Sequence, residues 1–101
     1  MIHLTEKTSI RLAIKPVDFR RQIDGLVAQC KREYQKDPRD GVLYVFINKS
    51  KSMIRFLHYD GTGYWIATKR LSQGKYYGWP SSSEPLTSLQ ASELKRIIVK
   101  K

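Results

Sequence analysis

Apolar and polar positions divide the chain into segments with distinct periods. Residues 9–14 alternate, with Ile10 and Leu12 on one side and Arg11 on the other. Such alternation predicts a short, half-buried β-strand. Pro16 follows and suits a helix start, where its missing N–H costs nothing.

A helical period runs through residues 17–36. Asp18 near its beginning and Lys31 and Arg32 near its end suit the helix dipole. The segment therefore predicts a long amphipathic helix whose apolar stripe has spacings of four, three, one, three and four: Phe19, Ile23, Leu26, Val27, Cys30 and Tyr34.

Residues 42–79 change to a β-forming composition. Asp60 and Gly61 open a strong hairpin signal, because glycine tolerates the positive φ of tight hairpin turns. Short connections between strands imply antiparallel pairing. We expect a β-meander with strands at 42–47, 53–59 and 64–70 and a short fourth strand at 75–79.

The last segment is predicted as a flexible spacer at 81–85 followed by a short helix over 87–99. Thr87 and Gln90 have the spacing of a capping box. We therefore predict an α+β fold, with residues 1–101 as a single domain. An N-terminal strand leads into the long helix of region 9–36, which packs on a three- or four-stranded antiparallel meander, and the C-terminal helix closes the sheet.

Length and composition exclude several classes of protein. The chain has 101 residues and one cysteine, Cys30, which cannot form an internal disulfide. No apolar run approaches the roughly 20 residues of a membrane span, and the first residues lack a secretory signal. We expect a cytoplasmic protein with no membrane partner.

The chemistry-bearing residues form no catalytic constellation. The acids are scattered, no Gly-rich phosphate loop is present, and His58 and Cys30 read as packed side chains. We therefore expect neither an enzyme nor a cofactor or metal. A nuclease-like enzyme is a third hypothesis, and the scattered acids argue against it.

Charge gives the strongest functional signal. Lys and Arg number 19 against 9 acids, a formal charge of +10, which favours a polyanionic partner. Basic and aromatic residues are interspersed through the predicted hairpins, where the basic residues could bind phosphates and the aromatic rings could stack on bases. The predicted DNA contacts are Lys49, Lys51, Arg55, Lys69, Arg70 and Lys75.

Two other surfaces could bind a partner. Tyr64, Trp65 and Tyr76 are predicted to be exposed and to dock on another protein. Arg32 and Lys36 lie on a basic line of the first helix, which reads more simply as an ordinary solvated face.

Several blocks of sequence match a known pattern in order and spacing. Residues 16–26 read PVDFRRQIDGL, residues 41–49 read GVLYVFINK, and residues 59–65 read YDGTGYW. Lys69-Arg70-Leu71, Trp79-Pro80 and Leu86-Thr87 follow. Together these blocks resemble the TnpB-type accessory proteins of bacterial insertion sequences of the sixty-six family. Phe19 and Gln22 depart from the usual first signature.

The resemblance implies a small non-enzymatic helper encoded beside a large transposase, which performs the DNA cutting and joining. The implied partners are the DNA of the element, its transposase and other proteins of the same element. We expect DNA binding, to transposon ends or without sequence preference. The alternative is an adaptor that docks on the transposase without contacting DNA.

Overall fold

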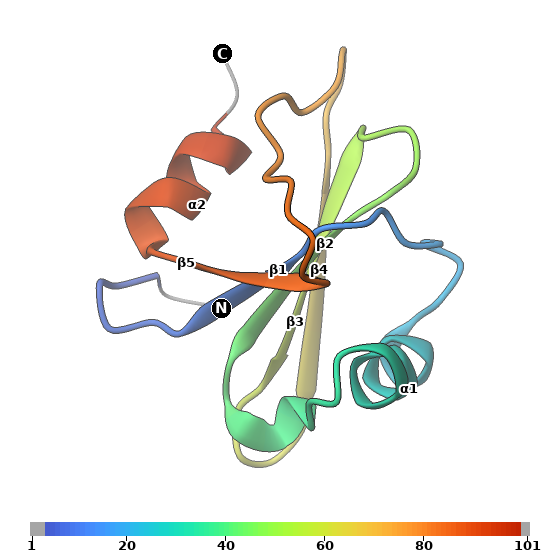
Figure 1. The fold of residues 1–101 in the computed structure, drawn as a ribbon, viewed down its shortest axis with the longest axis vertical. Helices are drawn as coiled ribbons and strands as arrows, with labels where there is room; N and C mark the ends of the chain where they lie inside the picture. The colour runs from blue at the N-terminus through green and yellow to red at the C-terminus, as the bar shows by residue number, and fades with distance from the viewer. Residues whose placement is uncertain (1–3, 100–101) are drawn as a thin grey trace.

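The structure, a computed structural model, describes residues 4–99 as a five-stranded sheet with one helix on each face (Figure 1). The predicted α+β class is confirmed. In chain order the elements are β1 (Ile10–Ala13), α1 (Ile23–Glu33), the short 3₁₀ helix η1 (Pro38–Asp40), β2 (Leu43–Ile47), β3 (Met53–Tyr59), β4 (Tyr64–Arg70), β5 (Leu86–Leu89) and α2 (Ala91–Ile98).

The strands lie in the order β4-β3-β2-β1-β5. The predicted antiparallel pairing of β2 with β3 and of β3 with β4 is confirmed. The prediction of a purely antiparallel meander is wrong, because β1 joins the same sheet parallel to β2 and antiparallel to β5. The sheet is therefore mixed, and the first and last strands of residues 4–99 lie side by side.

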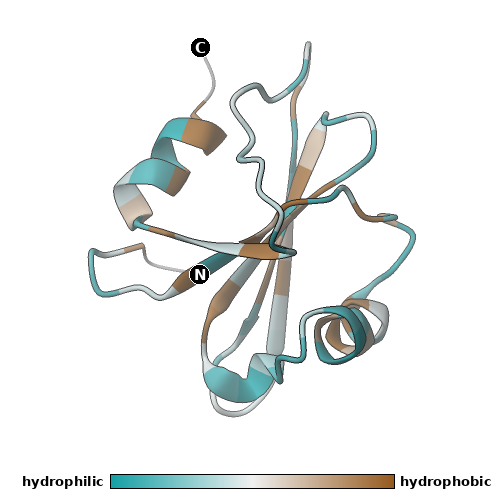
Figure 2. Ribbon diagram, in the orientation of Figure 1, coloured by the Kyte–Doolittle hydropathy of each residue, from teal (hydrophilic) through white to brown (hydrophobic). Residues whose placement is uncertain are grey.

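Side chains alternate across the strands, so each face has its own core. Phe46 points to one face and packs against Leu26 and Cys30 of α1. Val45 points to the other face, where Leu94 of α2 covers it. Both helices show teal and brown surfaces in Figure 2, as amphipathic helices between core and solvent do.

The first helix is shorter than the predicted span of 17–36. Val17 instead donates its backbone N–H to the Ile47 carbonyl at 2.9 Å. The carbonyls of Phe19 and Arg21 are bound by the side chain of Arg55. These contacts hold residues 17–22 against the sheet, and the helix begins only at Ile23.

The C-terminal region also differs from its prediction. β5 occupies the positions where a helix was expected to start, because these residues pair with β1. The capping interaction lies three residues later, where the Glu93 carboxylate accepts the Gln90 N–H at 2.9 Å. Helix α2 then runs from Ala91 to Ile98 rather than over 87–99.

The expected fourth strand at 75–79 is absent from the described chain, and this segment crosses the α2 face of the sheet instead. Tyr76 is buried against Ile47 and Ile54. Trp79 packs beside them and donates its indole N–H to the Ala13 carbonyl at 3.0 Å. Aromatic burial, rather than strand pairing, fixes the path of this segment.

Candidate nucleic-acid interface

The turn between β2 and β3 is organised by one side chain, Asn48. Its Oδ1 accepts the N–H groups of Ser52 and Met53, both at 3.0 Å. Its Nδ2 donates to the hydroxyls of Ser50 and Ser52 at 3.1 and 3.2 Å. A neutral amide therefore shapes the turn that presents Lys49 and Lys51.

The segment 71–79 is held against this turn by backbone hydrogen bonds. The Leu71 N–H donates to the Ser52 carbonyl at 2.9 Å, and the Tyr76 N–H donates to the Lys51 carbonyl at 2.8 Å. Figure 1 shows the 71–79 segment and the β2–β3 turn at the same end of the sheet. Lys75 is thereby brought to the turn lysines.

Three of the predicted DNA contacts meet in one hollow. Lys49, Lys51 and Lys75 line a hollow of about 400 Å³ together with the exposed Tyr77 and the half-buried Trp79. All three lysines are exposed. The hollow thus has a cationic rim and an aromatic wall.

Two more predicted contacts lie at the same end of the sheet. Arg70 is the cross-strand partner of Met53, the first residue of β3, and Lys69 is the partner of Ile54. Lys69 also donates its Nζ to the Ile98 carbonyl at 2.7 Å, so it neutralises the C-terminal end of α2. We call this group the cationic end of the sheet: Lys49, Lys51, Lys69, Arg70 and Lys75.

The ion pairs of the described residues involve other cations than these. Within residues 4–99 the ion pairs are Arg11 with Asp40, Arg20 with Asp18, and Arg39 with Asp37. The Arg20 side chain and, more weakly, Lys49 hold the pKa of Asp18 well below its usual value. No member of the cationic end forms an ion pair with any described residue, although Lys49 has Asp18 as an acidic neighbour and Lys69 is bound to the Ile98 carbonyl.

Arg55, the sixth predicted DNA contact, is a correction. Its side chain is buried, with 8% of its surface exposed. The guanidinium donates to the carbonyls of Phe19 and Arg21 at 3.0 and 2.8 Å and to the Thr68 hydroxyl at 2.8 Å. It also lies 4.5 Å from the centre of the Phe19 ring, a cation–π contact. Arg55 therefore fastens the segment before α1 to the sheet and is not a surface cation.

The three predicted partner aromatics have different environments. Trp65 is exposed over 49% of its surface. Tyr64 is half-buried, packs on the core beneath α1 and lies 5.0 Å from the Tyr59 ring. Tyr76 is only 1% exposed, so the prediction of an exposed Tyr76 is wrong. Of the three, Trp65 alone offers a large accessible ring.

Sequence reasoning missed Asn48 and Tyr77. Tyr77 is 72% exposed and borders the cationic hollow. Asn48 could have been found, because asparagine followed by lysine and serine between two apolar runs is typical of a side-chain-organised turn.

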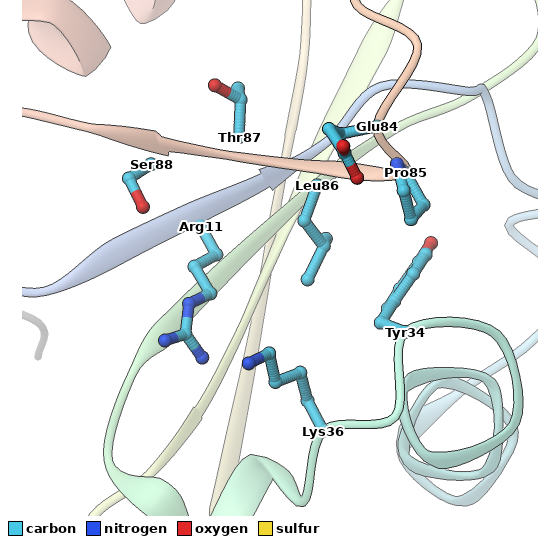
Figure 3. Close-up of a pocket in the computed structure, with 8 residues that line it drawn as sticks. All are labelled: Arg11, Tyr34, Lys36, Glu84, Pro85, Leu86, Thr87 and Ser88. Atoms are coloured by element: carbon cyan, nitrogen blue, oxygen red, sulfur yellow. The ribbon is translucent and has the colours of Figure 1, made fainter.

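A second hollow, of about 230 Å³, lies between β5 and the segment after α1. Figure 3 shows Arg11 of β1 and Lys36 reaching into it, with Tyr34 and Glu84 also on its wall. Arg11 is already bound, 3.5 Å from Asp40. Its mixed charges make this hollow a poorer fit to a polyanion than the cationic end.

The described residues offer little catalytic chemistry. Cys30 is fully buried, and burial raises the pKa of its thiol to about 12, so it stays protonated and unreactive. Residues 4–99 contain no group of three or more His, Cys, Asp or Glu side chains placed to hold a metal ion. Neither α1 nor α2 could span a bilayer, and no other helix of the described chain could do so.

Comparison with protein families matches residues 8–99 to the model of the "IS66 Orf2 like protein" family. The chain belongs to this family. The IS66 Orf2 like proteins are accessory proteins of transposition, so the predicted kinship with insertion-sequence helpers is confirmed.

Two curated relatives, both uncharacterized proteins of Sinorhizobium fredii, are similar to this IS66 Orf2 like chain. The protein y4jC is 38% identical over 76 residues, which cover 75% of this chain and 65% of y4jC. The protein y4hO is 26% identical over 98 residues, which cover 97% of this chain and 84% of y4hO. The chain thus spans just under two thirds of the length of y4jC. No solved structure is significantly similar.

Proposed function

We propose that this protein is a non-enzymatic accessory factor of transposition that binds DNA through the cationic end of its sheet. The observation that supports the proposal is the gathering of five predicted contacts at one place, where none of them forms an ion pair within residues 4–99. Three of them surround a single hollow. A scattered distribution of the same charges would have left no such surface.

The kind of contact follows from the side chains. Lysine ammonium groups are mobile point charges that suit phosphates, and phosphate contacts carry no direct sequence information. Phosphate contacts displace condensed counterions, so affinity falls steeply as salt rises. We therefore propose salt-sensitive binding with little sequence preference, and the transposase would supply site recognition and chemistry.

The experiment compares two triple variants that each remove three positive charges. The first variant combines Lys49→Gln, Lys51→Gln and Lys75→Gln. It removes the positive charge from the rim of the hollow. The second variant, the control, combines Lys31→Gln, Arg32→Gln and Lys36→Gln. It removes the same number of positive charges from α1 and the residues after it. Affinity for duplex DNA from an element end, and for a scrambled duplex, is measured by fluorescence anisotropy over a range of salt concentrations.

The rim variant should weaken duplex binding at low salt by at least about tenfold. Its plot of log affinity against log salt should lose roughly 0.9 of slope for each phosphate contact removed. The α1 variant should stay close to the unmodified protein. Equal losses in both variants would mean that net charge, and not this surface, drives binding.

The alternative function is an adaptor that docks on the transposase. Trp65 favours it, because an exposed tryptophan is typical of protein interfaces. The two functions separate in one measurement. Absence of any DNA complex at low salt, with co-purification of the transposase from nuclease-treated lysate, would replace the DNA proposal by the adaptor.

A further inference from the structure

One strip of the sheet is left uncovered on the face that α2 occupies. Every second residue of β4 points to this face, and three of these residues are exposed: Trp65, Ala67 and Lys69. His58, the cross-strand partner of Trp65, is partly exposed beside it. Helix α2 and the 71–79 segment cover the neighbouring strands, and of the β4 residues on this face α2 binds Lys69, whose Nζ donates to the Ile98 carbonyl. We call the four residues the β3–β4 strip.

Trp65 is held in place while much of its surface remains open. Its indole N–H donates to Asp60 Oδ2 at 2.7 Å. Asp60 is itself fixed, because its Oδ1 accepts the N–H groups of Thr62 and Gly63 at 2.9 and 3.0 Å. The polar group of the ring is thus already satisfied. What Trp65 offers a ligand is flat apolar surface, and a pre-positioned ring loses little entropy on binding.

The strip leads directly to the cationic end. Trp65 and Lys69 are four residues apart on β4, a span of about 13 Å, and Arg70 follows. A partner on this strip therefore meets the Trp65 ring, with the Asp60 carboxylate at its N–H edge, and then the positive charge of Lys69 and Arg70. Single-stranded nucleic acid has that chemistry, because its bases expose π faces and its backbone is anionic. A duplex hides its base faces in the stack and can use only the charges.

From this arrangement we infer that the β3–β4 strip binds single-stranded nucleic acid, with a base stacked on Trp65 and the backbone running toward the cationic end. The inference rests on the proposed function, since it uses the same cations for the phosphates. It adds a preference for unpaired strands, which phosphate contacts alone do not give.

The test uses the whole chain and three substitutions at one position. Trp65→Ala removes the ring, Trp65→Leu keeps apolar bulk without a π face, and Trp65→Phe keeps a stacking ring. Each is measured by anisotropy against a labelled oligothymidylate and a duplex of mixed sequence. Circular dichroism and thermal melting check that each variant is folded.

Trp65→Ala should weaken binding of the single strand by roughly ten- to a hundredfold, the effect of losing one stacked base. Trp65→Leu should weaken single-strand binding almost as much, whereas the affinity of Trp65→Phe should stay within about threefold of that of the unmodified protein. Duplex affinity should change by less than about twofold in all three variants. Quenching of tryptophan fluorescence by the single strand should fall sharply in Trp65→Phe, because the remaining tryptophan, Trp79, is half-buried.

Several outcomes would overturn the inference. Unchanged single-strand affinity in a folded Trp65→Ala variant would do so while leaving duplex binding, and with it the proposed function, intact. Loss of transposase binding in that variant, with normal single-strand binding, would assign the strip to a protein partner. If the unmodified protein binds neither form of DNA, the proposed function fails first and the stacking inference falls with it.

Discussion

The two turns at the ends of β3 use the same device and carry opposite charge. Asn48 and Asp60 each accept two backbone N–H groups through a side-chain oxygen. Backbone donors, the Trp65 indole and the Thr62 hydroxyl hold the pKa of Asp60 well below its usual value, so it stays ionised. The amide of Asn48 brings no charge to the lysines beside it. The choice between two similar side chains therefore separates a cationic end of the sheet from an acidic one.

The largest predicted effect concerns the residue midway between the turns. Arg55→Ala should lower the free energy of unfolding by about 3–5 kcal/mol, because two backbone carbonyls lose a charged donor. Arg55→Lys should recover only part of this, since an ammonium cannot reproduce the fork of a guanidinium. Urea denaturation followed by circular dichroism measures both.

The same variant also tests the correction made for Arg55. Any Arg55→Ala protein that remains folded should bind duplex DNA normally. A stable variant that has lost DNA binding would restore Arg55 as a phosphate contact.

Asn48→Asp should give the β2–β3 turn the negative charge that Asp60 gives the β3–β4 turn. The carboxylate keeps the acceptor oxygen that shapes the turn and adds a negative charge beside Lys49 and Lys51. A unit charge at about 4 Å in water is worth roughly 1 kcal/mol, so duplex affinity should fall about fivefold. Anisotropy at low salt measures it, and raised salt should shrink the difference.

Asp60→Asn is the matched control at the other end. The turns are separated by the length of β3, about 20 Å, which exceeds the Debye length of about 10 Å at 0.1 M salt. Duplex affinity should therefore change by less than about twofold. A loss as large as that of Asn48→Asp would show that the two ends are not electrostatically separate.

The acidic turn should also reveal itself in the pH dependence of stability. The pKa of Asp60 is lower in the folded chain than in the unfolded chain, so the unfolded chain binds protons more readily as pH falls below about 4. Its contribution is fully present above that value and is lost toward lower pH. Asp60→Asn should therefore be less stable than the unmodified protein at pH 7, and the gap should narrow in acid. A gap independent of pH would contradict this.

A small effect is also predicted at Tyr76, which fixes the 71–79 segment at the cationic end. Its hydroxyl is buried and has no hydrogen-bond partner among the described residues. Tyr76→Phe should leave stability unchanged or raise it by about 0.5–1 kcal/mol. Thermal melting measures this, with Tyr76→Ala as the contrasting variant that costs several kcal/mol through its cavity. Marked destabilisation by Tyr76→Phe would mean that the hydroxyl is satisfied in solution.

The sequence predicted local structure well where the signal was local. The bounds of β3 and β4 and the turn at Asp60 follow from alternation and turn residues a few positions apart. The bounds of α1 failed because Phe19 continues the helical stripe in sequence, whereas in space its carbonyl binds Arg55. That contact joins residues far apart in the chain, and no period can reveal it.

The pattern of apolar and polar residues also could not predict the pairing of strands that are distant in sequence. β5 is short and follows a serine-rich stretch, and its partner β1 lies at the other end of the chain. The gathering of the cationic end was foreseeable for Lys49 and Lys51, which share a turn. Lys75 joins them only because buried Tyr76 draws its segment across the sheet.

The pairing of β1 with β5 has a consequence for synthesis. Ile10 leaves the ribosome well before its partner Leu89. Until β5 has been made, one edge of β1 has no partner strand. Chains that lack β5, whether nascent or truncated, should therefore be the forms most prone to edge-to-edge association.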